Sequence, residues 1–334
     1  DDVPVLLGGA PWAPALLLAK VQRWAYDRAA ELRPGPPAAA VITHPAGWGT
    51  YRLDVLRQAA IQSGIPDPIL LSEPAAAATH CVHDRLAVGA TVAVYDFGGG
   101  TFDAAVARRE ADGYTVLGKP QGIERVGGLN VDEAVLAFVD DALGGALDRL
   151  GDDDVADVVE LRQRCSIAKE ALADEATTAV PVRLRHVQTD VRLTRDDLRA
   201  MVQPLLAETV TALNRSLESA GMTAADLDQV LLVGGSSRLP LVSETLSAAL
   251  NGVPVIAEPQ PKLAIALGAA RHGHLVLHGP VAAPAPPPPA APVAPPPPVA
   301  PAVAPVAPVV PAAPAPVTVT PTPETAPAAA AATP

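Results

Sequence analysis

Residues 94–103 of this chain read VYDFGGGTFD, and they indicate two strands joined by a glycine loop. Glycine adopts the positive φ values that let several backbone N–H groups converge on one point, so such a loop can wrap an anion. Asp96, at the end of the first strand, is placed to hold a metal-bound water, and Thr101 adds a hydroxyl within reach of a phosphate oxygen. We therefore expect a phosphate-binding loop. The alternative is a glycine-rich hairpin without a ligand.

A second glycine loop lies at residues 231–240, which read LLVGGSSRLP. A buried strand that runs into Gly234 and Gly235 and then into a helix lets a planar or anionic group approach the helix N-terminus. Arg238 can stack its guanidinium on a base. The chain contains no Walker A sequence, and the protein-kinase signatures that accompany Asp-Phe-Gly are missing, so these two nucleotide-binding classes are excluded.

Strand and helix signals alternate around these two loops, which predicts the α/β class. Thr194 and Asp197 have the spacing of a helix N-cap. The expected helices are 13–30, 50–63, 74–83, 131–143, 155–172, 194–220 and 239–250, and the expected strands are 39–43, 69–71, 91–95, 102–108, 114–117, 180–193 and 229–233.

The composition excludes several classes of partner. The net charge is −12 over 334 residues, and without a Lys/Arg cluster the chain is poorly suited to bind nucleic acid or an anionic membrane. No run of about 18 apolar residues is present, so no membrane span is expected. Cys81 and Cys165 are too few for a disulfide framework and indicate a reducing compartment, so we expect a cytoplasmic location.

The composition changes abruptly at residue 280. Residues 280–334 are rich in Pro, Ala and Val and carry one charged side chain, Glu324. Such a segment buries too little apolar surface to offset the entropy of ordering, so we expect a disordered tail of polyproline II character after a globular part at 1–279. The tail is interpreted as a spacer, with a role as a proline-motif ligand as the alternative.

Six stretches in register resemble the nucleotide-binding domain of the seventy-kilodalton heat-shock chaperones (the DnaK type), within the actin-like ATPase superfamily. Together they cover residues 14–271, essentially the whole globular part. The resemblance implies an α/β fold of the actin-like ATPase (ribonuclease-H-like) type and an ATP-binding chaperone. The stretches are 41–46 (VITHPA), 71–77 (LSEPAAA), 95–103, 126–132 (VGGLNVD), 161–172 and 232–240.

The resemblance also implies ATP or ADP with Mg²⁺ as the ligand. Glu73 and Asp96 would be the acids that hold Mg²⁺ through water and arrange the attacking water, with Thr101 as a third catalytic residue. Phosphoryl transfer depends on positioning and charge neutralisation, which these groups and a cradle of backbone N–H groups supply. The implied nucleotide contacts are Gly98, Gly99, Gly100 and Thr101 at the β- and γ-phosphates, Gly127 and Gly128 beside them, Lys169 at the ribose, and Gly234, Gly235, Ser236 and Arg238 around the adenosine.

Several departures from the family pattern limit what is expected of this chain. The family begins with an Asp-x-Gly-Thr-Thr loop and a later catalytic lysine, and this chain lacks both. We therefore expect the chain to be N-terminally incomplete. ATP hydrolysis is expected to be weak or absent in the chain as it stands and to be restored when the domain is complete. In the adenosine site, Ser166, Ala173 and Lys262 replace family side chains, which implies looser contacts. No peptide-binding domain follows the last matched stretch.

Two other functions remain open. One is a degenerate nucleotide-binding sensor or scaffold without turnover, and the other, less favoured, is an actin-like sugar kinase, because residues for a hexose pocket are not found. A co-chaperone or client protein is the expected partner. His272, His274 and His278 are interpreted as a solvated chain exit from the globular part.

Overall fold

The computed structural model describes residues 3–33, 35–82, 85–149, 151 and 154–279. They belong to one compact unit, Asp1–Ala283. The predicted tail at 280–334 lies outside the described residues.

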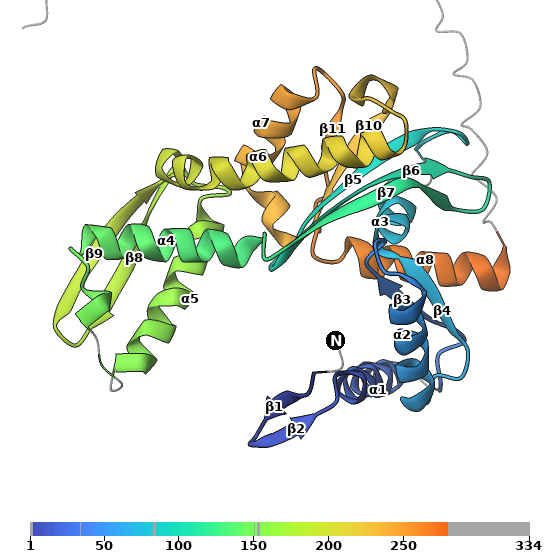
Figure 1. Ribbon diagram of the computed structural model, residues 1–334, viewed down its shortest axis with the longest axis horizontal. Coiled ribbons are helices and arrows are strands. Elements are labelled where there is room, and N and C mark those ends of the chain that lie inside the picture. The colour runs from blue at the N-terminus through green and yellow to red at the C-terminus, as the bar shows by residue number, and fades with distance from the viewer. Residues whose placement is uncertain (1–2, 34, 83–84, 150, 152–153, 280–334) are drawn as a thin grey trace, which may run out of the picture. The chain divides into compact units, whose positions relative to one another are not determined.

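A five-stranded mixed sheet forms the centre of this unit, in the order β11-β10-β5-β6-β7 (Figure 1). β10 runs parallel to β5 and β11, whereas β6 is antiparallel to β5 and β7. The strands are β5 (Thr91–Phe97), β6 (Thr101–Arg109), β7 (Tyr114–Glu124), β10 (Gln229–Val233) and β11 (Val255–Ala257).

The hairpin predicted around the three glycines is confirmed, but its strands are longer than expected. The first strand was expected at 91–95, yet Asp96 pairs with Asp103 and Phe97 with Phe102 in the β5–β6 ladder, so the loop is 98–100. β7 continues past its expected end at residue 117, because 118–120 bulge out of the ladder and pairing resumes beyond them. Gly118 lies at this bulge with φ +62°, where a Cβ atom would be 2.5 Å from the Ala220 nitrogen.

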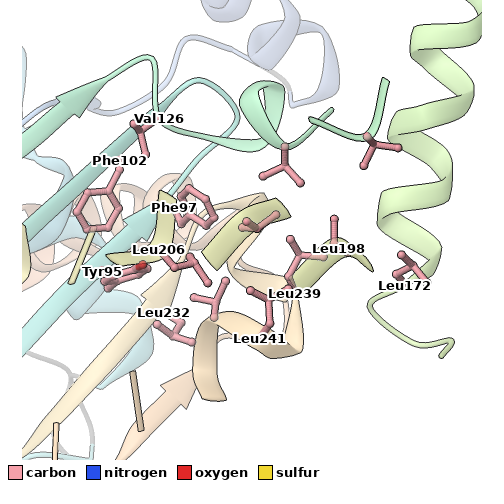
Figure 2. Close-up of a cluster of buried hydrophobic side chains, with 14 of the residues drawn as sticks. Tyr95, Phe97, Phe102, Val126, Leu172, Leu198, Leu206, Leu232, Leu239 and Leu241 are labelled. Atoms are coloured by element: carbon pink, nitrogen blue, oxygen red, sulfur yellow. The ribbon is translucent and has the colours of Figure 1, made fainter. Parts of the chain in front are cut away.

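The two faces of β5 pack against different helices. Val92 and Val94 face a cluster formed with α3 (Glu73–Cys81). Tyr95 and its alternate neighbours face the larger core built with α6, which spans Arg195–Ser219. Figure 2 shows the Tyr95 ring in this second cluster near Leu206. The alternation follows from the period of two along a strand, and it buries both faces of the central sheet.

Helix α8 (Ala264–His278) was not expected. It contains the three histidines interpreted as a solvated chain exit; His274 and His278 are indeed exposed, but all three belong to this helix. The helix packs against α3. At Gly268 a Cβ atom would overlap the Ala76 carbonyl oxygen, so the close crossing of the two helices requires glycine at this position. His274 and His278 stack one helical turn apart, with ring centroids 4.5 Å apart. Glycines at a packed crossing give the same sequence signal as glycines that break a helix.

The remaining elements follow the predicted alternation, with two additional strands near the N-terminus. The stretch expected as one strand at 180–193 is instead a hairpin of two antiparallel strands. The Thr194 N-cap is confirmed, because its hydroxyl accepts the Asp197 N–H at 3.1 Å and its own N–H donates to the Asp197 carboxylate at 2.9 Å. These elements are β1 (Val5–Leu7), β2 (Ala10–Trp12), α1 (Pro14–Leu32), the parallel pair β3 (Ala40–His44) and β4 (Pro68–Ser72), α2 (Thr50–Gln62), α4 (Gly128–Ala142), α5 (Val155–Ala171), the hairpin β8 (Thr177–Leu184) and β9 (Val187–Thr194), α7 (Pro240–Ala249), and short 3₁₀ helices at Leu147–Arg149, Ala224–Asp226 and Gly235–Arg238.

None of the helices in the described ranges is long and apolar enough to cross a bilayer.

Candidate functional site

Three segments that are far apart in the sequence meet at the triglycine loop. The Gly98 carbonyl accepts a hydrogen bond from the Ser236 hydroxyl at 2.8 Å and another from the Gly128 N–H at 3.0 Å. The Gly99 carbonyl accepts the Leu129 N–H at 2.7 Å. The β5–β6 loop, the start of α4 and the loop after β10 are therefore held together by direct contacts.

Glycine is required where these segments touch. A Cβ atom on Gly127 would lie 2.7 Å from the backbone of Gly99 and Gly100. Gly234 has φ +81°, and a Cβ atom there would overlap the Asp96 carboxylate. The glycines thus permit an approach of backbone to backbone that any side chain would prevent.

The junction borders a cavity of about 370 Å³. This volume falls within the usual range for small-molecule sites. Of the residues expected to contact nucleotide, six line the cavity, whereas Gly98, Gly100, Thr101, Gly127 and Gly234 lie in the surrounding loops. The lining residues are Gly99, Gly128, Leu129, Asp132, Ser166, Lys169, Glu170, Ala173, Gly235, Ser236, Arg238, Leu239 and Lys262.

Lys169 reaches the cavity from α5 and bonds to α4. Its ammonium lies 2.7 Å from Asp132 Oδ1 and donates a hydrogen bond to the Gly128 carbonyl at 3.1 Å. Asp132 was part of a predicted glycine element but had received no role. Its position one turn after Gly128 on an α-helix was the available signal, since residues four apart share a helix face.

The mouth of the cavity carries a second, more exposed ion pair. Lys262 Nζ lies 3.3 Å from Glu170 Oε1, and both side chains are more than half exposed. Lys262 also covers Gly235, where a Cβ atom would be 3.0 Å from its Cε atom. Ser166 lies on α5 and Ala173 just beyond its end, and both line the cavity. All three residues that depart from the family pattern in the adenosine site therefore line this cavity.

The expected catalytic acids lie in a separate narrow cleft, which Asp103 also lines. Burial first, and then the charges of Asp96 and Asp103, raise the pKa of Glu73 to about 7. Burial and the Asp103 charge raise the pKa of Asp96 to about 7. Burial raises the pKa of Asp103 as well. Asp103 was not expected here, although its place in the cross-strand ladder opposite Asp96 could have indicated it.

Thr101 begins β6, and its carbonyl accepts the Gly98 N–H at 3.0 Å. Its side chain is exposed and lines neither the large cavity nor the acidic cleft. Glu73 is the first residue of α3, directly after β4. Glu73 and Asp96 are thus brought together, while Thr101, the first residue of β6 after the triglycine loop, lies outside both sites.

A family model described as Hsp70 protein matches residues 12–283. The chain belongs to the Hsp70 family. The match includes all six stretches on which the resemblance rested, and the mixed sheet agrees with the predicted actin-like ATPase fold. This Hsp70 chain carries the family's nucleotide-binding domain.

Curated relatives of this Hsp70 chain are named chaperone protein HscA homolog. The relative from Pseudomonas putida is 33% identical over 260 residues, which is 78% of this chain and 40% of that protein. The relative from Acidithiobacillus ferrooxidans is 30% identical over 262 residues, which is 77% of this chain and 40% of that protein. The relative from Bordetella pertussis is 32% identical over 265 residues, which is 79% of this chain and 42% of that protein. The chain thus spans about two fifths of the length of these relatives.

Proposed function

We propose that this chain binds ATP or ADP in the cavity between its two glycine loops. The observation that carries the proposal is that Gly99, Gly128 and Gly235 line one cavity of about 370 Å³. Backbone N–H groups at such loops favour phosphate oxygens, while Arg238 and Lys169, which line the same cavity, suit a base and a ribose. In this proposal Gly98, Gly99, Gly100 and Thr101 face the phosphates, with Gly127 and Gly128 beside them, and Gly234, Gly235 and Ser236 frame the adenosine.

We propose Mg²⁺ as the companion ion, held through water by Glu73 and Asp96. Mg²⁺ prefers oxygen ligands and keeps several of its waters. Burial raises the pKa of Glu73, Asp96 and Asp103, and a hydrated cation beside these three carboxyl groups would stabilise their charged forms. In the described part of the chain no three His, Cys, Asp or Glu side chains are arranged to ligate a metal directly. When bound, the ion would neutralise charge on the phosphates.

The same acids suit ATP hydrolysis. Asp96 and Glu73 both have a pKa near 7, where a carboxyl can accept a proton from a water molecule and release it again. Thr101 would contribute its exposed hydroxyl at the loop. We propose that the chain hydrolyses ATP when the family's Asp-x-Gly-Thr-Thr segment is supplied, and weakly or not at all without it.

Calorimetric titration with ADP and ATP, in the presence and absence of Mg²⁺, tests the binding proposal. We expect binding of both nucleotides, strengthened by Mg²⁺ for ATP. A completed domain that carries the Asp-x-Gly-Thr-Thr segment and still shows no affinity for either nucleotide would overturn it. Adenosine titrated alone serves as the control, because it shares the base and ribose and lacks the phosphates.

A sensor or scaffold that binds nucleotide without turnover is the second candidate. The replacements at Ser166, Ala173 and Lys262 favour it, because all three line the cavity. Phosphate release by the completed domain with Mg²⁺, abolished by Asp96→Asn, would exclude this candidate. Nucleotide binding without any release of phosphate would exclude the ATPase instead.

The names of the relatives support a role as a chaperone, so we propose that this protein works with a client protein or co-chaperone. We propose a cytoplasmic location, supported by the free cysteines Cys81 and Cys165. Co-purification from cytoplasmic extract in the presence of ADP, compared with ATP, tests both statements, since a chaperone of this kind should hold partners in a nucleotide-dependent manner.

A further inference from the structure

Two adjacent serines in the 3₁₀ helix Gly235–Arg238 bond to different parts of the molecule. The Ser236 hydroxyl donates to the Gly98 carbonyl, 138 residues away, at 2.8 Å. The Ser237 hydroxyl donates to the Gly234 carbonyl of its own turn at 2.7 Å. Both residues are buried, with 7% and 4% of their surface exposed. The two serines therefore differ mainly in their acceptor: the Ser236 hydroxyl bonds to another loop, and the Ser237 hydroxyl bonds within its own turn.

The Ser236 hydroxyl also fills the space beside Gly128. A Cβ atom on Gly128 would lie 2.6 Å from Ser236 Oγ. Because the Gly128 N–H bonds to the same Gly98 carbonyl at 3.0 Å, this oxygen receives two donors from two different segments. The carbonyl is thereby held from the α4 side and from the β10 side at once.

We propose that Ser236 is a positioning residue that holds the triglycine loop in place through the Gly98 carbonyl. This inference goes beyond the proposed contact of Ser236 with adenosine and rests on the proposed function in assigning the two loops to two ends of one nucleotide. A ligand that orders the loop after β10 also orders the triglycine loop through this bond, even when the ligand has no phosphate. Loss of the hydroxyl removes this bond between the two loops, while each loop keeps its own local bonds.

Hydrogen exchange of the full chain, followed by mass spectrometry, tests the positioning role without any ligand. Three backbone N–H groups report on the junction: Gly98, which donates to Thr101, Gly128, which donates to Gly98, and Leu129, which donates to Gly99. In Ser236→Ala we expect peptides that cover 98–101 and 127–130 to exchange about five-fold faster, the factor for loss of one buried hydrogen bond.

Ser237→Ala is the matched control, because it removes a buried hydroxyl from the same turn and leaves the loop-to-loop bond intact. We expect it to speed exchange at 234–238 and to leave 98–101 at the wild-type rate. Equal exchange at 98–101 in both variants would overturn the proposal. Melting temperatures of both variants, measured in parallel, show whether either change acts through global unfolding.

A ligand comparison then tests the consequence. Adenosine should slow exchange at 98–101 in the wild-type chain and in Ser237→Ala, and should fail to do so in Ser236→Ala. Equal protection of 98–101 by adenosine in all three proteins would overturn the proposal. A wild-type chain that ADP does not protect anywhere would overturn the proposed nucleotide binding, while the ligand-free comparison would still decide whether Ser236 positions the loop.

Discussion

The Lys169 ammonium lies 2.7 Å from the Asp132 carboxylate, and the two side chains are only 9% and 18% exposed. No hydrogen-bond donor of suitable angle reaches Asp132 Oδ1 from the described residues, so Lys169 balances this charge as an ion pair. A charge with little access to water depends on its partner, because the cost of removing it from water is not otherwise repaid. The contact joins α5 to α4 beside the cavity.

Lys169→Met should therefore destabilise the chain. It leaves the Asp132 carboxylate unpaired in a mostly buried position, and we expect a loss of about 2–3 kcal/mol in the free energy of unfolding, measured in urea. The double variant Lys169→Met with Asp132→Leu should recover much of this loss, since no charge is then left unpaired.

The exposed pair at the cavity mouth supplies the control. Lys262→Met removes the partner of Glu170, but both side chains of that pair are more than 60% exposed. Water then solvates the remaining carboxylate, and the change should stay below about 0.5 kcal/mol. Equal losses for Lys169→Met and Lys262→Met would show that burial does not determine the strength of these pairs.

Substitutions at Gly234 and Gly99 distinguish a glycine that the fold requires from a glycine that ligand binding requires. Gly234→Ala combines positive φ with overlap of Asp96, and we expect a loss of more than about 2 kcal/mol in unfolding free energy. At Gly99, φ lies outside the positive range and no atom lies within 4 Å of the position of a new Cβ atom. For Gly99→Ala we therefore expect a loss below about 1 kcal/mol in unfolding free energy.

Because Gly99 lines the cavity, its Cβ atom should instead weaken ADP binding. Calorimetric titration and urea unfolding of the same two variants make the comparison. Unchanged ADP affinity in Gly99→Ala would contradict a phosphate-binding role for this loop.

The acidic cleft should make stability depend on pH. Because the pKa of Asp96 is raised to about 7, the folded chain binds more protons than the unfolded chain between about pH 4 and pH 7. Stability should therefore fall as pH rises through this window. Asp96→Asn removes the effect, so it should melt about 2–4 °C above wild type at pH 8 and close to wild type at pH 4.

Asp197 provides a control of opposite sign. Hydrogen bonds from Thr194 hold its pKa below the usual range, so its contribution is present at neutral pH and is lost as pH falls. Asp197→Asn should be less stable than wild type at pH 7, and the difference should shrink below about pH 4. The same pH trend for both variants would contradict the assignment of either shift.

One buried hydrogen bond ties the central sheet to α6. The Tyr95 hydroxyl lies 2.5 Å from Thr209 Oγ1, and both residues have no exposed surface. Tyr95→Phe should cost about 1 kcal/mol in unfolding free energy, and Thr209→Val a similar amount because it leaves the phenol unpaired. A double variant whose loss equals the sum of the two single losses would show that the residues act independently.

Local patterns were sufficient to predict most helices, the triglycine hairpin and the N-cap at Thr194. They depend on periodicity, capping and turn residues within a few positions of one another, which are visible in a linear sequence. α8 was missed, since its glycines lie at a helix crossing, and the far half of β7 was missed because a bulge interrupts its pattern. In both cases contacts with a segment distant in the sequence stabilise the element, and these contacts are not visible in the local pattern.

The sequence by itself determined the α/β class, the two glycine loops and the family to which the chain belongs. Only the tertiary structure decided that Gly128 and Ser236 both donate hydrogen bonds to the Gly98 carbonyl. It also decided that Lys169 pairs with Asp132, and that Asp103 lies beside the two expected acids. The physical reason is range: strand and turn preferences act over a few residues, whereas these contacts, apart from the Asp96–Asp103 pair within one hairpin, join segments about 30 to 140 residues apart and form only when the sheet and helices pack.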